Sequence, residues 1–227
     1  MDSSGVEFKT NIAFAGLTAA GKTTHSRLLA EDLGYDYVSA TDILLEILGI
    51  ADSGDQIWFT HLDEIHSARD DEAVDTELEN RLLEMVRTRQ RTVFDTWALA
   101  WIGPAPLVRI WIESDIASRA RKCVVSERAN RFNEEQCRQL IHNKDIYNRE
   151  IFQRRHGFDL FRDRSRYDAI LCNSHLIPEA TEEAAATGIE SFAPVVLSVA
   201  TSLLGRDRVG LQATCRRYPG EVLGVAA

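Results

Sequence analysis

Short apolar runs alternate with amphipathic stretches along most of the chain. The apolar runs predict buried strands at 11–15, 37–39, 92–94, 107–112 and 167–172. Helical spacing predicts helices at 22–33, 42–48, 74–89, 134–155 and 179–204, with a further helix capped by Asp115. Because the strands alternate with helices, we predict an α/β fold with a five-stranded parallel sheet and helices on both faces.

The pattern contains no internal repeat and no linker between two domains. We therefore expect one domain over residues 1–205. Residues 53–71 are polar and mixed in pattern, which favours a mobile helical segment. The tail at 206–227 has little periodicity, so we expect it to be loose.

Composition narrows the class of protein. The 227 residues are 44% hydrophobic and 27% charged, and the net charge of −9 argues against a nucleic-acid-binding surface. We find no apolar run long enough for a membrane span and no signal-peptide core, so we expect a cytoplasmic protein without a membrane partner. The four cysteines form no CxxC pair, and we interpret them as reduced packing thiols.

Charge is unevenly distributed. Residues 119–166 hold thirteen lysines and arginines and seven acidic residues, a local net charge of +6 in an acidic chain. A basic segment of this kind suggests an anionic small ligand such as a polyphosphate. The alternative is a solvated helical face.

Residues 16–24, GLTAAGKTT, fit the phosphate-binding pattern GxxxxGK[ST]. An apolar strand before the motif and an amphipathic helix after it are the context that this pattern requires. Glycines let the backbone curl so that N–H groups converge on phosphate oxygens, and the helix N-terminus adds partial positive charge. The cofactor-binding candidates are Gly16, Leu17, Thr18, Ala19, Ala20, Gly21, Lys22, Thr23 and Thr24.

Two side chains of this loop have specific expected roles. Lys22 is placed to reach the β- and γ-phosphates, and the Thr23 hydroxyl to ligate magnesium. The alternative is a glycine-rich turn with an exposed lysine. We predict ATP and Mg²⁺ as cofactors, although no motif distinguishes ATP from GTP.

Two aspartates are candidates for the rest of the centre. Asp95 ends an apolar strand, where a carboxylate can hold the magnesium shell or orient an acceptor hydroxyl; the alternative is a residue that begins a loop. Asp42 follows the second strand and is a candidate general base, with a helix cap as the alternative.

Four blocks stand in order along the chain: AFAGLTAAGKTTHSRLLAEDLGYDYVSATDIL, VDTELENRLLEMVRTRQRTVFDTWALAWI, VRIWIESDIASRARK and HGFDLFRDRSRYDAILCNS. Together they resemble the cytidylate kinase branch of the nucleoside monophosphate kinases, especially the short archaeal-type enzymes, over about residues 11–176. The resemblance implies a P-loop NTPase fold with a five-stranded parallel sheet. It also implies a helical lid at about 119–166 and an acceptor-binding region at about 42–90.

The sequence departs from this family at three positions. Members carry an arginine within GDIxR, another in EGR and a third before the YGID-like stretch. This chain has Leu45, Trp97 and Ile151 there, with Arg149, Arg154 and Arg155 close to the third. The first two family arginines bind the phosphate of the acceptor. Neither leucine nor tryptophan supplies the positive charge that binds a monophosphate.

The replaced arginines favour an acceptor that arrives without a phosphate: a nucleoside, a nucleoside analogue or another hydroxylated metabolite. Related P-loop kinases, such as deoxynucleoside kinases, shikimate kinase and chloramphenicol phosphotransferase, accept such molecules. The substrate-binding candidates are Asp42, Leu45, Trp97 and Trp101, with Trp58 as a further ring. The alternative is that the three tryptophans are ordinary core residues.

The lid segment has more basic residues than a phosphate needs. We choose Arg119, Arg121 and Arg154 as the catalytic arginines that neutralise charge in the transition state, together with Lys22, Asp42 and Asp95. The resemblance supports the first two, which match family arginines. Other candidates are Arg128, Arg131, Lys144 and Arg155, most of them expected on the surface.

Three functions stay open. The leading prediction is an ATP-dependent kinase of a small hydroxylated acceptor, acting as a monomer or a homodimer. The first alternative is a cytidylate-type monophosphate kinase that uses Arg69 or Arg81 instead, and the second is a nucleotide-binding sensor without turnover. A metal site at His61, Asp63, Glu64 and His66 is conceivable, but a polar surface segment has the same composition.

Overall fold

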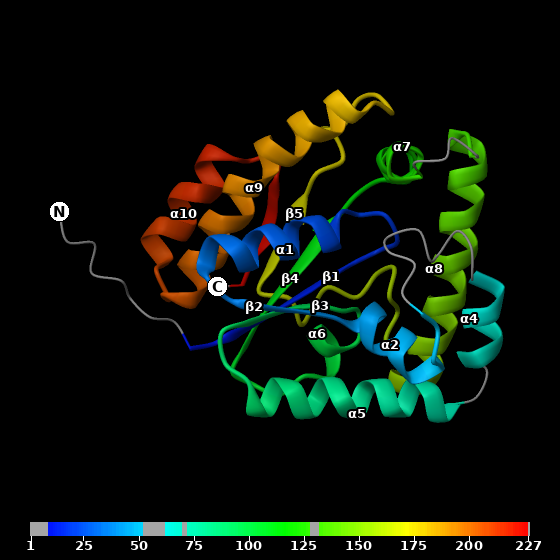
Figure 1. Cartoon of the computed structure of the whole chain (residues 1–227). Helices are drawn as coiled ribbons and strands as arrows, with labels where there is room; N and C mark the ends of the chain where they lie inside the picture. Colours follow the sequence, from blue (N-terminus) through cyan, green and yellow to red (C-terminus); the bar gives the residue numbers. More distant parts are fainter. Residues whose placement is uncertain (1–8, 52–61, 70–71, 128–131, 227) are drawn as a thin grey trace.

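The computed structural model describes residues 9–51, 62–69, 72–127 and 132–226. Its centre is a six-stranded sheet in the order β2-β3-β1-β4-β5-β6 (Figure 1). The pairs among the first five strands are parallel, and β6 runs antiparallel to β5. The strands are β1 Asn11–Gly16, β2 Asp36–Ser39, β3 Thr92–Asp95, β4 Leu107–Glu113, β5 Ala169–Cys172 and β6 Val222–Val225.

The helices follow the strands as the sequence predicts; α4 lies within the segment 53–71 that is predicted to be helical, and α6 and α10 are two short additions. They are α1 Lys22–Leu33, α2 Ala40–Leu48, α4 Leu62–Arg69, α5 Glu72–Thr88, α6 Leu99–Ile102, α7 Ile116–Ser126, α8 Glu134–His156, α9 Glu182–Leu204 and α10 Arg208–Arg217. The predicted α/β fold with a five-stranded parallel sheet is confirmed, and one antiparallel strand extends it.

Alternation along the central strand explains the layers. Ile12 and Phe14 of β1 pack into the core under α1 and α9, whereas Ala13 and Ala15 pack into the core that α5 and α6 cover. Since successive side chains of a strand point to opposite faces, a strand that is apolar throughout is buried on both sides. Figure 1 shows the two helical layers, with α1, α9 and α10 on one face and α5 and α6 on the other.

Helix α9 corrects one expectation from composition. By length and composition this helix is apolar enough to cross a membrane. The expectation that no apolar run is long enough for a membrane span is therefore wrong. A core helix of a soluble protein passes the same test. In this fold Phe192, Val195, Val196 and Val199 of α9 are buried in the core beside the sheet.

The C-terminal residues also differ from expectation. The segment predicted to be loose forms α10, which packs on α9, and β6, which pairs with β5. Asp207 caps α10 by accepting a hydrogen bond from the Gly210 N–H. Weak periodicity hid both elements because they are short, and much of α10 is exposed.

Candidate active site

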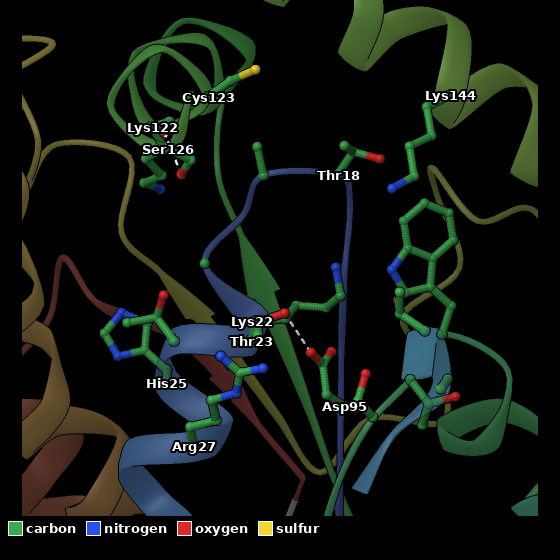
Figure 2. Close-up of a pocket in the computed structure, with 18 of the residues that line it drawn as sticks. Thr18, Lys22, Thr23, His25, Arg27, Asp95, Lys122, Cys123, Ser126 and Lys144 are labelled. Atoms are coloured by element: carbon green, nitrogen blue, oxygen red, sulfur yellow. Dashed lines mark hydrogen bonds between the residues drawn. The ribbon is translucent and has the colours of Figure 1, made fainter. Parts of the chain in front are cut away.

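A cavity of about 940 Å³ opens at the carboxyl ends of the parallel strands. Residues that follow β1, β2, β3 and β5 line it, which is the edge where α/β folds bind ligands. Figure 2 shows 18 of its lining residues, drawn from the loop after β1, from α1, and from α7 and α8 across the opening. The volume is large enough for a nucleotide and a small second ligand.

The loop after β1 has the backbone shape that binds phosphate. At Gly16 a Cβ would lie 2.7 Å from the Ile112 carbonyl oxygen, so only glycine fits there. Gly21 has a φ of +92°, in the left-handed region, and it is the N-cap of α1. Among the residues that the structure describes, no side chain caps this helix, so the N–H groups of its first turn have no capping partner there. This open helix N-terminus fits an anion such as the phosphates of ATP.

Lys22 is the first residue of α1, and its amino group points into the cavity (Figure 2). The Nζ atom lies 3.3 Å from the Leu17 carbonyl oxygen and 5.1 Å from the centre of the Trp97 ring. Desolvation lowers the pKa of Lys22, while Asp95 and Asp145 oppose that shift. An anion bound beside this ammonium would gain a poorly solvated and therefore strong electrostatic partner.

Thr23 and Asp95 meet at the floor of the cavity. The Thr23 hydroxyl donates to the Asp95 carboxylate over 2.5 Å, and the Tyr37 hydroxyl donates to the same oxygen over 3.3 Å. Burial raises the pKa of Tyr37, so this phenol stays a donor. A hydroxyl and a buried carboxylate are oxygen ligands that suit Mg²⁺, and both lie next to the open helix N-terminus.

A buried ion pair fixes the loop to the lid segment. Arg119 of α7 pairs with Asp145 of α8, and both side chains are less than 9% exposed. Asp145 also accepts a hydrogen bond from the Thr18 N–H over 2.9 Å, and Arg119 donates to the Thr18 carbonyl over 3.1 Å. Arg119 therefore holds the loop in place but is not among the residues that line the cavity.

A second group of buried polar residues comes from α4, α5 and α8. Arg69 donates to Asp75 over 2.9 Å and to the Asn148 side-chain oxygen over 3.0 Å, and Lys144 lies one helical turn before Asn148. Burial, followed by the charge of Lys22, lowers the pKa of Lys144 well below its usual range. Arg69, Lys144 and Asn148 all line the cavity.

One part of the cavity lining is apolar, and we call it the apolar end. It is formed by Leu44, Leu45, Leu78, Leu82, Trp97 and Phe152. Asp42 lines the cavity as well, exposed in the first turn of α2. The cap of α2 is Ser39, whose hydroxyl accepts from the Asp42 N–H, so the carboxylate of Asp42 does not cap the helix.

Three predicted site residues lie elsewhere. Trp101 stacks on Phe158 at 4.2 Å between ring centres and is not among the lining residues. Arg121 donates to the Ile177 carbonyl over 2.7 Å and so supports the loop after β5. Arg154 is 57% exposed and lies 3.6 Å from Glu72. Whether a residue lines the cavity depends on the helix face that it occupies, because neighbours in sequence point in different directions.

Other candidates are engaged elsewhere or lie outside the described residues. Glu46 and Glu77 bind Arg81, Asp159 binds Arg149, and Glu79 binds Arg155. Trp58, His61, Arg128 and Arg131 fall outside the described residues. Within the described ranges, no three His, Cys, Asp or Glu side chains are grouped to hold a metal ion.

Sequence reasoning missed three cavity residues beside the loop. His25, Lys122 and Asn173 line the cavity near Gly21. Burial, with the charge of Lys122, lowers the pKa of His25 to about 4, so this imidazole is neutral. These residues stand in the blocks that resemble the family but outside the motif at 16–24, and the fold brings α7 and the end of β5 to the loop.

Known proteins match this chain in sequence and in fold. A model of the cytidylate kinase-like family matches residues 11–175. The cytidylate kinase of Natronomonas pharaonis is 27% identical over 81% of this chain and 91% of that enzyme, and the cytidylate kinase of Pyrococcus horikoshii is 26% identical over 82% and 92%.

Among solved structures, shikimate kinase from Bacteroides thetaiotaomicron has a TM-score of 0.51 at 15% identity, over 85% of this chain and 98% of that protein. An uncharacterized protein from Eubacterium ventriosum has a TM-score of 0.57 at 13% identity, over 86% and 99%. These two likenesses concern the fold alone.

Proposed function

The chain belongs to the cytidylate kinase-like family, and we propose that it transfers the γ-phosphoryl group of Mg²⁺–ATP to a hydroxyl of a small acceptor that carries no phosphate. A nucleoside, a nucleoside analogue or another hydroxylated metabolite fits this description. The observation that carries the proposal is the apolar end, where Leu45 and Trp97 line the cavity. Neither side chain neutralises a phosphate.

Different residues of the chain would bind the phosphates, hold the metal ion and accept the proton of the acceptor. The N–H groups at the start of α1 and the Lys22 ammonium would bind the phosphates, with the Lys144 amino group as a further hydrogen-bond donor beside them. Thr23 and Asp95 would hold Mg²⁺, which when bound neutralises charge on the phosphates. Asp42 would accept the proton of the acceptor hydroxyl, since it is an exposed carboxylate that lines the same cavity.

A second candidate function rests on Arg69. This side chain lines the cavity near Lys144, and its guanidinium would suit a cytidylate-type kinase whose acceptor brings its own phosphate. Asp75 already matches the charge of Arg69 at 2.9 Å, which leaves less of it for an incoming anion. We therefore rank this candidate second.

A substrate panel separates the two candidates. Purified protein with Mg²⁺–ATP is tested on cytidine, deoxycytidine, uridine and adenosine against CMP, dCMP and UMP, with ADP release as the readout. We expect turnover of at least one unphosphorylated acceptor above all monophosphates. The reverse order would overturn the proposal, and ATP binding without turnover of a broad panel would favour a sensor.

Substitution of Trp97 sharpens the same test. Trp97→Arg supplies a guanidinium at the apolar end and should raise the preference for a monophosphate over its nucleoside by about tenfold. Trp97→Phe keeps an apolar ring and serves as the matched control, with the wild-type order of preference. An unchanged preference in Trp97→Arg would show that this position does not face the acceptor.

A further inference from the structure

A lysine on α7 is connected to the phosphate-binding loop through one asparagine. Lys122 donates from Nζ to the Ser114 hydroxyl over 2.8 Å and to Asn173 Oδ1 over 2.5 Å. Asn173 in turn donates from Nδ2 to the Ala20 carbonyl oxygen over 2.9 Å. The loop is thereby tied to the end of β5, although Ala20 and Asn173 are 153 residues apart in sequence.

The chemistry of the three partners allows one orientation of the Asn173 amide. An ammonium can only donate and a carbonyl can only accept, so an amide between them must turn its oxygen to Lys122 and its NH₂ to Ala20. Asn173 is 3% exposed, so water does not easily replace either partner. The Lys122 ammonium and the Ala20 carbonyl therefore stabilise the same orientation of the amide.

The Ala20 carbonyl matters because of the peptide group that it belongs to. In a planar trans peptide the C=O and the following N–H point in opposite directions. Because Asn173 binds the Ala20 oxygen, the Gly21 N–H of the same peptide points away from Asn173, and Gly21 lines the cavity. A carbonyl oxygen in that place would repel phosphate, whereas an N–H binds it.

We propose that Lys122 is a positioning residue for the nucleotide, and that it acts through Asn173 to hold the Ala20–Gly21 peptide in the phosphate-binding orientation. The inference rests on the proposed binding of Mg²⁺–ATP by this loop. Lys122 also lines the cavity, so a direct contact with the nucleotide is the competing explanation.

A double-substitution cycle separates these explanations. Binding of a fluorescent ATP analogue with Mg²⁺ is measured for Lys122→Met, Asn173→Ala and the double variant. Each single change should weaken binding about tenfold, and the double variant should be no weaker than the weaker single variant, because both break one connection. Effects that multiply to about a hundredfold would overturn the proposal in favour of direct contact.

Lys144→Met is the matched control for additivity. This lysine lies on α8 at the other side of the loop, so its effect should multiply with that of Asn173→Ala. Thermal unfolding of each variant checks that the fold is retained.

Asn173→Asp tests the contact with the loop by itself. The carboxylate still accepts from Lys122 but offers no N–H to the Ala20 oxygen, and the ion pair should help the variant to fold. Binding should be at least about tenfold weaker than in the wild type. Wild-type affinity in this variant would overturn the proposal.

The pH dependence supplies a readout that a merely structural role would not change. Burial, opposed chiefly by Asp115, lowers the pKa of Lys122 to about 7; Cys172 also favours the ammonium, and Arg119 and Arg121 disfavour it. His25, the facing group on α1, is neutral in this range. The ammonium is therefore present below pH 7 and lost above it.

The ratio of the Lys122→Met to the wild-type dissociation constants should fall as the pH rises from 6 to 9. A constant ratio would contradict the proposal. If the wild-type protein does not bind Mg²⁺–ATP at all, the proposed function fails. If it binds and the variants bind equally well, only the role of Lys122 fails.

Discussion

The two ends of the cavity are built in different ways. At the loop end, hydrogen bonds to buried charged side chains hold the residues in place. Asp95 binds Thr23, and both Arg119 and Asp145 bind the backbone of Thr18. At the apolar end, most of the surface is aliphatic or aromatic side chains from α2, α5 and α8, and from the segment after β3. Kinases share the triphosphate as a ligand, so backbone N–H groups can bind it. Acceptors differ between kinases, so side chains must recognise them.

This difference has a consequence for substitutions. Changes at the loop end should remove activity on every acceptor, since they affect the shared phosphates. Changes at the apolar end should alter which acceptor is used.

Lys22→Ala should lower kcat by about a thousandfold or more on any acceptor, because it removes the cation beside the transferring phosphate. ADP release in the presence of the best acceptor measures the loss. Lys9→Ala is the control, because Lys9 is an exposed lysine before β1. Activity within tenfold of wild type would exclude Lys22 from the reaction.

Asp95→Asn should lower kcat by about a hundredfold and raise the Mg²⁺ concentration needed for half-maximal activity. The amide keeps the shape of the side chain but lacks the negative charge of the carboxylate, which accepts hydrogen bonds from the Thr23 and Tyr37 hydroxyls. Asp36→Asn, at the exposed start of the neighbouring strand β2, is the control. An unchanged Mg²⁺ requirement would place the metal elsewhere.

Asp145→Asn should reduce the free energy of unfolding by about 3 kcal/mol, since it leaves the buried Arg119 without its counter-charge. Urea unfolding measures this loss. Glu135→Gln breaks the exposed pair with Arg138 and should have no measurable effect. Equal stability of the two variants would contradict the structural role of the Arg119–Asp145 pair.

Arg154→Ala should change kcat and KM for ATP by less than about twofold, the smallest effect of the series. Its side chain is 57% exposed and contacts Glu72 rather than the cavity. Steady-state kinetics with varied ATP is the measurement. A tenfold loss would show that Arg154 reaches the phosphates when the lid segment moves.

Much of the fold could be predicted from the sequence, because a strand that is buried on both faces appears as a continuous apolar run. The apolar runs of β1, β3 and β4 and the helical spacing of α1 correspond closely to the observed bounds. The motif at 16–24 identified the loop because its glycines and lysine stand at fixed spacing. Element β6 was missed because four residues with weak alternation carry little pattern.

The candidate site was less predictable, because it depends on which helix faces meet. Trp97 and Trp101 are four residues apart, yet only Trp97 lines the cavity. Arg119 and Arg121 are two apart on α7 and make unrelated contacts, one with Thr18 and Asp145 and the other with Ile177. Asn173 and Lys122 lie in two separate blocks of the sequence, and their contact depends on how β4, β5 and α7 are arranged.

Strand β6 has a consequence for the solubility of the protein. It covers the side of β5 that would otherwise present unpaired N–H and C=O groups to solvent. A chain ended after Arg206 would keep every residue that lines the cavity but expose an open sheet edge. Such a shortened protein should self-associate through strand pairing, so an affinity tag is better attached at the N-terminus than in place of the last twenty or so residues.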